Sequence, residues 1–260
     1  MGKILSDVIT STSYDGKHTL EFRVSSHRYQ LDGEPVRGAT TIGSVYPKGE
    51  GLIKWLIDQG PEAYESRKVL KDAGNIGTIL HTYAECYETK ADFDWKQVEG
   101  HEHEQTIRRV IDRFTVWRAG NSDEVVRAED IIASPSLRVG GRIDTLRRRE
   151  TLGLVLSDYK TAKDIYITHL IQVIGGYRRM AREWLNLDVP YVEIVTFPKL
   201  AKDDMKILLA DKDGWVKDGV RTDIPNLFEK VEMQFERNAA TYQFQKEVEE
   251  VLTPPYYRRK

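Results

Sequence analysis

The sequence predicts an α/β protein with a central mixed β-sheet, helices on both faces and an N-terminal β-hairpin. Three observations predict this fold class. Short runs rich in β-branched residues, such as 190–197, are candidate strands. Between them lie segments whose apolar residues recur at helical spacing. The chain has 260 residues and a hydrophobic content of 40%, enough for a sizeable core. We therefore expect layered packing around a sheet of about five strands.

We interpret the whole chain, residues 1–260, as a single domain with four regions. These are an N-terminal hairpin region (1–48), a helical region (49–120), a core with two acidic strands (121–210), and a C-terminal helix and tail (211–260). No internal repeat is evident, and a final helix is expected at 225–238.

The N-terminal region predicts a β-hairpin. Residues 19–31 have the pattern of a strand, and the Asp-Gly-Glu turn signal at 32–34 leads into a second run. Thr41 and Ser44 lie close to Gly43, where their hydroxyls either cap the following helix or donate hydrogen bonds to a phosphate.

Helical periodicity is present in several segments before residue 120. The first covers 50–59 and ends at Gly60-Pro61, and the next covers 61–70. In residues 77–85, His81 and Glu85 are four positions apart and therefore lie on one face of a helix. A further helix is expected at 101–119, with apolar residues at i, i+3, i+4 and i+7.

Two neighbouring strands carry the most informative acidic residues. The run R-V-G-G-R-I-D ends at Asp144, and L-V-L-S-D-Y-K-T contains Asp158 and Lys160. Asp158 and Lys160 are two positions apart, so they share a strand face while Tyr159 points away. Carboxylates among apolar neighbours need a cation or hydrogen bonds, and hard oxygen ligands suit Mg²⁺ or Mn²⁺. The alternative is a surface salt bridge at a strand end.

A helix is expected at 165–187, and it carries Gln172 and Tyr177. Their separation is five residues, with Gly175 and Gly176 between them. Two interpretations are open. Either the glycines allow a locally wide helical turn that stacks the two side chains, or Tyr177 is displaced from Gln172.

Charge and cysteine content exclude several classes of protein. A formal net charge of −2 gives no general attraction to nucleic acid, so a polyanion needs a local patch. Candidate basic clusters lie at 147–149, 178–182 and 258–260.

The single cysteine, Cys86, excludes an intramolecular disulfide and a cysteine-ligated iron–sulfur cluster within one chain. With no secretion signal and no apolar run that spans a bilayer, we expect an intracellular protein with no membrane partner.

Several motifs, taken in chain order, resemble one known family. They are G-x-x-x-H-x-x-x-E at 77–85, G-R-I-D at 141–144, D-Y-K-T at 158–161, and Gln172 followed by Tyr177. This combination resembles the PD-(D/E)XK nuclease superfamily and, within it, the RecB-like branch. The resemblance covers residues 77–177 and extends to stand-alone exonucleases, such as those of phages and mitochondrial genome maintenance. It implies a restriction-endonuclease-like core.

The resemblance also implies a set of functional residues. The implied catalytic residues are Asp144, Asp158 and Lys160, with Lys160 positioning or deprotonating the attacking water. The implied ligands of one or two Mg²⁺ or Mn²⁺ ions are His81, Asp144, Asp158 and the carbonyl of Tyr159. Weaker candidates at the site are Glu85, Glu129, Gln172 and Tyr177. Implied contacts with nucleic acid come from Thr41, Ser44, Arg142, Thr161 and Arg178.

The function that follows is metal-dependent hydrolysis of phosphodiester bonds in DNA. The resemblance implies an exonuclease that acts on single-stranded ends, in the cytoplasm of a bacterial or phage-infected cell. Two alternatives stay open at this point. One is a structure-selective endonuclease or a DNA-processing subunit of the same fold, and the other is a non-catalytic scaffold that binds nucleic acid.

Overall fold

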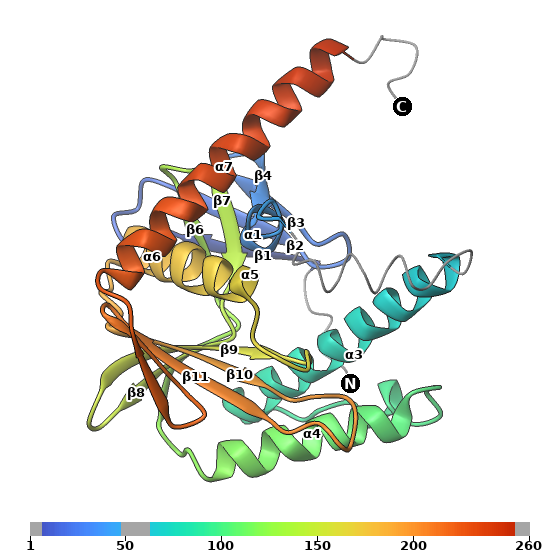
Figure 1. Cartoon of the computed structure of the whole chain (residues 1–260). Coiled ribbons are helices and arrows are strands. Elements are labelled where there is room, and N and C mark those ends of the chain that lie inside the picture. The colour runs from blue at the N-terminus through green and yellow to red at the C-terminus, as the bar shows by residue number, and fades with distance from the viewer. Residues whose placement is uncertain (1–6, 48–62, 253–260) are drawn as a thin grey trace.

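The computed structural model describes residues 7–47 and 63–252. Its fold is α/β, with helices flanking two mixed β-sheets and a hairpin at the start of the chain (Figure 1). The predicted fold class is confirmed. The single central sheet that we expected is instead a pair of sheets with six and seven strands.

The first sheet contains the N-terminal strands and has the order β1-β2-β3-β4-β7-β6. Its strands are β1 (Val8–Thr12), β2 (Thr19–Arg23), β3 (Arg28–Leu31), β4 (Glu34–Gly38), β6 (Ile131–Ser134) and β7 (Val139–Arg142). Residues 19–31, expected as one strand, are divided by a turn. His27 in that turn has a φ of 53°, and the Asp7 carboxylate accepts a hydrogen bond of 2.9 Å from the Ser25 amide. Such side-chain bonding to the backbone favours a turn over a continuous strand.

The second sheet has the order β13-β12-β11-β10-β9-β8-β5. Its strands are β5 (Glu124–Ala128), β8 (Thr145–Arg149), β9 (Gly153–Lys160), β10 (Tyr191–Thr196), β11 (Lys206–Asp211), β12 (Gly214–Lys217) and β13 (Val220–Asp223). The parallel pair β9 and β10 lies in the middle, and the other pairs are antiparallel. A helical crossover joins β9 to β10, as a parallel pair requires.

The chain passes directly from a strand of one sheet to a strand of the other at two points that lie side by side. The segment 125–134 divides into β5 and β6 at Glu129-Asp130, and β7 gives way to β8 at Ile143-Asp144. The Glu129 amide donates to the Asp144 carbonyl (2.9 Å), and the Ile143 amide donates to the Asp130 carbonyl (3.0 Å). Glu129 has a φ of 52° there. The two passages are therefore hydrogen-bonded to each other, which brings Glu129 and Asp144 side by side.

Helices cover both faces of the second sheet (Figure 1). On one face lie α3 (Ala63–Thr89) and α4 (Glu104–Ala119), which share an apolar cluster with Tyr159 and Phe197. The separate helices expected at 61–70 and 77–85 are parts of α3, and the helix expected at 50–59 lies outside the described residues. A short 3₁₀ helix, η2 (Trp95–Gln97), precedes α4.

The crossover helix packs on the opposite face, and the C-terminal helix packs on the crossover helix. The crossover comprises α5 (Ile167–Leu170), η3 (Ile171–Arg178) and α6 (Arg179–Leu185), and the short helix α1 (Ala39–Gly43) packs beside η3. The C-terminal helix α7 (Leu227–Leu252) is longer than the 225–238 helix that we expected and projects beyond the rest of the protein (Figure 1). No glycine or proline interrupts residues 227–252, so nothing local stops the helix earlier. Within the described part of the chain, none of the helices combines the length and apolar character needed to cross a bilayer.

The η3 segment is a π-helix, which decides between the two interpretations of the Gln172–Tyr177 spacing. Glycines let it pack closely against α7. A Cβ on Gly175 would lie 2.7 Å from the Phe235 Cβ, and a Cβ on Gly176 would lie 2.9 Å from the Phe235 Cε2. The locally wide turn is therefore present, and it depends on glycine at both positions.

Candidate active site

A cavity of about 640 Å³ lies where the first sheet, α3, α5, η3 and the end of β9 meet. It gathers most of the site residues that the sequence predicted. Those that line it are Thr41, Ser44, His81, Glu129, Arg142, Asp144, Asp158, Lys160, Gln172 and Tyr177. These residues lie up to about 136 positions apart in the sequence, so the fold and not local spacing brings them together.

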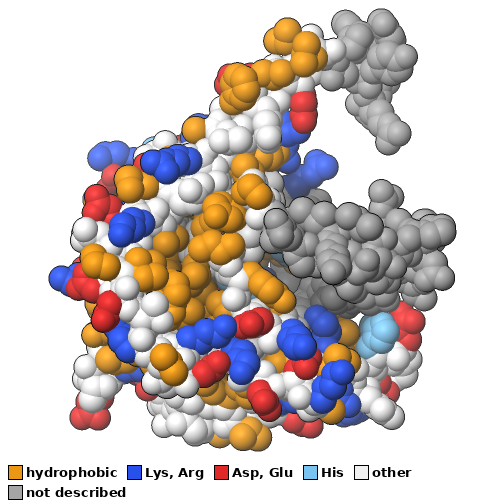
Figure 2. Space-filling view, viewed as in Figure 1, with side chains coloured by type: hydrophobic (Ala, Val, Ile, Leu, Met, Phe, Trp, Pro, Cys, Tyr) orange, Lys and Arg blue, Asp and Glu red, His pale blue; other side chains and the backbone are white. Residues whose placement is uncertain are grey.

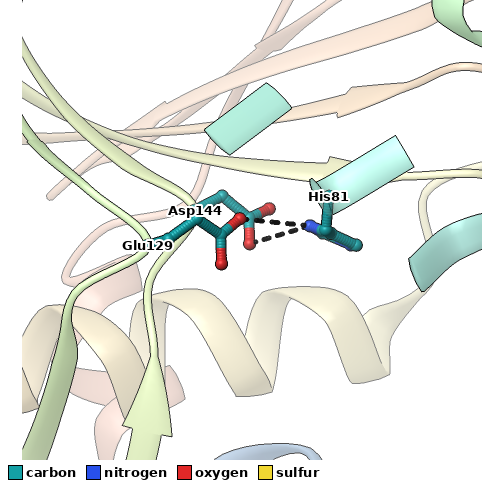
Figure 3. Close-up of side chains that lie close together, drawn as sticks. All are labelled: His81, Glu129 and Asp144. Carbon is teal, nitrogen blue, oxygen red and sulfur yellow. Dashed lines mark ion pairs between the residues drawn. The ribbon is translucent and has the colours of Figure 1, made fainter. Parts of the chain in front are cut away.

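Three of these side chains, from His81, Glu129 and Asp144, form a group that could hold a metal ion and is called the metal-ligand group below. Nδ1 of His81, on α3, lies 3.2 Å from Oδ1 of Asp144 and 3.7 Å from Oε1 of Glu129. One possible ligand atom from each residue lies within 4.8 Å of the others. Figure 3 shows both carboxylates pointing toward the imidazole from the place where the strands change sheet. Glu129, which was a weaker candidate in the sequence, is thus close enough to His81 for both side chains to bind the same ion.

Burial and mutual charge control protonation in this group. Burial alone would lower the pKa of His81, but Asp144 and Glu129 outweigh it and raise that pKa to about 10. Burial raises the pKa of Glu129 to about 7, and the charge of Asp144 adds to the increase. Burial would also raise the pKa of Asp144, but His81 holds it below its usual range. Without metal, His81 is therefore an imidazolium beside the Asp144 carboxylate.

Asp158 and Lys160 lie on the same face of β9, as their spacing predicted. Nζ of Lys160 donates a hydrogen bond of 2.9 Å to Oδ1 of Asp158. The Asp158 side chain is only 1% exposed, and burial raises its pKa to about 6. Burial would lower the pKa of Lys160, but Asp158 and Asp144 raise it, so the ammonium persists. The Tyr159 amide donates a 2.5 Å hydrogen bond to Oδ2 of Asp144, which links this strand to the metal-ligand group.

The residues present fit a divalent cation. Among the described residues, Oε1 of Glu129 and Oδ2 of Asp158 are buried and accept no hydrogen bond, although Nζ of Lys160 lies 2.7 Å from Oδ2 of Asp158. A buried carboxylate oxygen without a donor is costly, and a bound cation removes that cost. One imidazole with several carboxylates is a donor set that suits Mg²⁺ or Mn²⁺. His81, Glu129, Asp144 and Asp158 are the residues that would hold such an ion.

Arg142 connects the metal-ligand group to the next turn of α3. Its guanidinium lies 2.9 Å from Oε2 of Glu129 and 2.8 Å from Oε2 of Glu85. Glu85 lies outside the cavity lining, and its ion-pair partner is Arg142. The contacts of Glu85 therefore support pairing with an arginine of the site.

Gln172 and Tyr177 form a second wall of the cavity. Nε2 of Gln172 donates to the Tyr177 hydroxyl (2.8 Å) and to Oγ1 of Thr40 (3.0 Å). Glycines permit this packing, since a Cβ on Gly141 would lie 2.8 Å from Cε1 of Tyr177. The π-helical turn therefore places the glutamine and the tyrosine on one face despite their spacing of five.

Three other predicted residues lie outside the cavity lining. The Tyr159 ring points away from it, and its hydroxyl is 2.8 Å from Oγ1 of Thr145. Thr161 accepts a hydrogen bond from Lys199 through its carbonyl (3.0 Å). Arg178 binds Glu232 (2.5 Å) and Asp188 (3.1 Å), so its guanidinium is already paired within the protein. The structure thus offers no support for Arg178 as a nucleic-acid contact.

Two of the basic clusters expected from the sequence, 147–149 and 178–182, are largely neutralised, and the third, 258–260, lies outside the described residues. Arg147 is fully buried and pairs with Asp123 and Glu193, and Arg149 pairs with the same two carboxylates. On the face shown in Figure 2, Lys and Arg side chains alternate with Asp and Glu and form no surface of one sign. On that face, the charges therefore give no broad attraction for a polyanion.

Several cavity residues were not predicted from the sequence, among them His27, Tyr29, Thr168 and His169. Burial, reinforced by the charge of Lys160, lowers the pKa of His169 to about 3, so its imidazole is neutral. His169 precedes Gln172 by three residues, a spacing that places both on one helix face and could have identified it. His27 lies in the β2–β3 turn, and no spacing pattern links it to the site.

Comparison with known proteins does not identify a family for this chain, so the function is inferred from the geometry of the site. No protein-family model matches the chain, and no curated protein matches it. Among solved structures, the chain is similar to the crystal structure of SSO0001, with 11% identity over 56% of this chain and 66% of that chain. The TM-score is 0.29, which is too low to carry an argument about fold or function.

Proposed function

We propose that this chain is a metal-dependent deoxyribonuclease of the RecB-like branch of the PD-(D/E)XK superfamily. One observation carries the proposal. The metal-ligand group, the Asp158–Lys160 pair and the Gln172–Tyr177 pair line a single cavity. These are the motifs whose order in the sequence resembles that branch.

The protein's own residues divide the work in this proposal. Asp144 and Asp158 would hold the cation, and His81 and Glu129 would complete the set of ligands. A bound Mg²⁺ or Mn²⁺ supplies Lewis-acid polarisation of the scissile phosphate and makes water more acidic. Lys160 keeps its proton beside Asp158, so it orients the attacking water and stabilises negative charge on the phosphate rather than acting as a base.

The substrate strand is held by polar groups on the other walls of the cavity. Arg142 supplies N–H donors and Thr41 supplies a hydroxyl donor. The amide of Gln172 and the hydroxyl of Ser44 line the same walls, but they already donate to groups of the protein. A net charge of −2 gives the protein no general attraction for a duplex. We therefore propose an exonuclease on single-stranded DNA ends, which needs only a short local contact.

The test is cleavage of labelled DNA in Mg²⁺ and in Mn²⁺. Asp158→Ala and Lys160→Ala should each abolish cleavage, whereas Asp164→Ala should not. Asp164 is a matched control because its carboxylate pairs with Lys217, as Asp158 pairs with Lys160, but lies outside the cavity lining. Undiminished turnover by folded Asp158→Ala would remove the proposal.

A closed circular single strand separates the alternatives within this chemistry. An exonuclease leaves the circle intact and degrades the same strand once it is linear. A structure-selective endonuclease opens the circle. A non-catalytic scaffold binds both forms and cleaves neither, with or without Mn²⁺.

A further inference from the structure

The segment that follows Lys160 forms part of the cavity, and no role has yet been assigned to it. Thr168 and His169 line the cavity, and Tyr166, which is 52% exposed, lies just before them in the chain. The Tyr166 and His169 rings meet edge to face, with centroids 5.4 Å apart. An aromatic ring is thus held next to a neutral imidazole at the cavity.

Hydrogen bonds determine which nitrogen of His169 is free to donate. The Tyr166 amide donates to Nδ1 of His169 (3.2 Å), and the His169 amide donates to the Tyr166 carbonyl (2.9 Å). Because Nδ1 accepts a hydrogen bond, the neutral imidazole carries its proton on Nε2. Within the described residues no group accepts from Nε2. His169 therefore offers one oriented, uncharged N–H donor.

The exposed ring of Tyr166 complements that donor. Single exposed aromatics are common on protein surfaces and need no function. Tyr166 differs because its backbone amide and its ring both contact His169, which lines the cavity, and these contacts fix its position. Aromatic side chains next to a backbone-binding groove are what proteins use to stack the bases of single strands.

We propose that Tyr166 and His169 form a nucleotide-binding element of the cavity. Nε2–H of His169 donates to a phosphate oxygen, and the Tyr166 ring stacks on an unpaired base of the same strand. This inference rests on the proposed function, because it takes the substrate to be a nucleic acid strand. It deepens that function by assigning one residue to the phosphate and another to the base.

The experiment measures the Kd of a fluorescent single-stranded oligonucleotide in EDTA and the KM for its cleavage in Mn²⁺. A second oligonucleotide contains abasic sites. The variants are Tyr166→Ala, Tyr166→Phe, His169→Asn and His169→Gln. Tyr14→Ala is the control, because Tyr14 is similarly exposed (61%) but lies in the turn between β1 and β2.

Tyr166→Ala should raise Kd and KM about tenfold, the effect expected when one stacked base is lost. It should have no effect with the abasic oligonucleotide, and Tyr166→Phe should match the wild type. His169→Asn should weaken binding to both oligonucleotides. His169→Gln should bind better than His169→Asn, because the longer amide can place an N–H near the former Nε2.

The outcomes that overturn this inference differ from those that overturn the proposed function. If the wild type cleaves DNA while Tyr166→Ala and His169→Asn retain its Kd and KM, the inference fails and the nuclease stands. A loss in Tyr166→Ala that is equal on the abasic oligonucleotide also overturns it, since the ring then acts without a base. If the wild type neither binds nor cleaves either oligonucleotide, the proposed function fails as well.

Discussion

Gln172 donates a 2.8 Å hydrogen bond to the hydroxyl of Tyr177, five residues further along the helix. In an α-helix, residues three or four apart share a face, whereas the i→i+5 hydrogen bonding of a π-helix brings residues five apart together. The segment from Ile171 to Arg178 has that geometry, and α7 packs against its glycines. The cavity wall therefore depends on a contact made from outside the cavity.

Gly175→Ala should destabilise the protein by about 1–3 kcal/mol, because its Cβ would overlap Phe235 and the Val231 carbonyl. Gly74→Ala in α3 is the matched control. A Cβ there meets nothing within 4 Å, so it should be neutral or stabilising by up to about 1 kcal/mol. Urea unfolding of both variants measures the difference. Equal stability of the two variants would show that the contact between η3 and α7 tolerates a side chain at Gly175.

Metal affinity should increase with pH, because His81 must lose a proton to bind a cation. Its pKa near 10 in the metal-free protein predicts release of one proton between pH 7 and 9. The Kd for Mn²⁺ should then fall about tenfold per pH unit, and more steeply below pH 7, where Glu129 is also protonated. Calorimetry in buffers of different ionisation enthalpy checks the proton count. A Kd independent of pH would contradict the ion pair.

Glu129→Gln should stabilise the metal-free protein at pH 8. The folded-state pKa of Glu129, about 7, lies above the usual 4.5, so burying its charge destabilises the fold increasingly from pH 4.5 to pH 7 and fully above. Glutamine removes that charge and leaves an oxygen for Arg142. We expect a gain on the order of 1–3 kcal/mol and a Tm rise of about 2–4 °C per kcal/mol.

The same variant should lose stabilisation by Mn²⁺, and its advantage should vanish near pH 4.5. Thermal unfolding in EDTA and in Mn²⁺ at both pH values tests this pattern. Glu124→Gln, at an exposed glutamate of β5, serves as the control and should change neither curve. A lower Tm for Glu129→Gln in EDTA at pH 8 would show that its ion pairs outweigh the cost of burial.

Arg147→Met should reduce stability by about 3 kcal/mol without touching the cavity. Arg147 is completely buried, pairs with Asp123 at 2.8 Å and with Glu193, and stacks on Trp117. Its removal leaves a buried carboxylate with less compensation. Arg148→Met, at a neighbouring side chain that is 57% exposed, should change stability by less than about 0.5 kcal/mol. Similar urea midpoints for the two variants would argue against the buried network.

Local patterns in the sequence predicted much of the second sheet and its site. Alternation on β9 placed Asp158 and Lys160 on one face, and their 2.9 Å hydrogen bond confirms this. The four-residue spacing placed His81 and Glu85 on one face of α3, yet His81 contacts Asp144 while Glu85 contacts Arg142. Periodicity shows which side chains share a face, but it does not show what lies opposite that face.

The features that the sequence did not predict depend mainly on contacts between residues that are far apart in the chain. Nothing in V-V-R-A-E-D-I-I-A-S marks Glu129 as the point where the chain changes sheet, because that break exists only against its partner at Ile143-Asp144. The length of α7 was underestimated because its polar C-terminal half lacks an amphipathic pattern. The basic runs were misleading for a related reason, since the acids that neutralise Arg147 and Arg178 lie far away in the sequence.

Cleavage by Asp144→Asn tests the central claim most directly. Asp144 contacts His81 and the Tyr159 amide, whereas Asp130, at the same passage between sheets, pairs with Arg127 outside the cavity lining. Rates with a 5′-labelled single strand and Mn²⁺ are measured for both asparagine variants. Asp144→Asn should lose more than about 100-fold, since even the outer partners of metal ligands contribute about 10–100-fold, and Asp130→Asn should match the wild type. Equal rates for Asp144→Asn and the wild type would contradict a metal-dependent nuclease at this cavity.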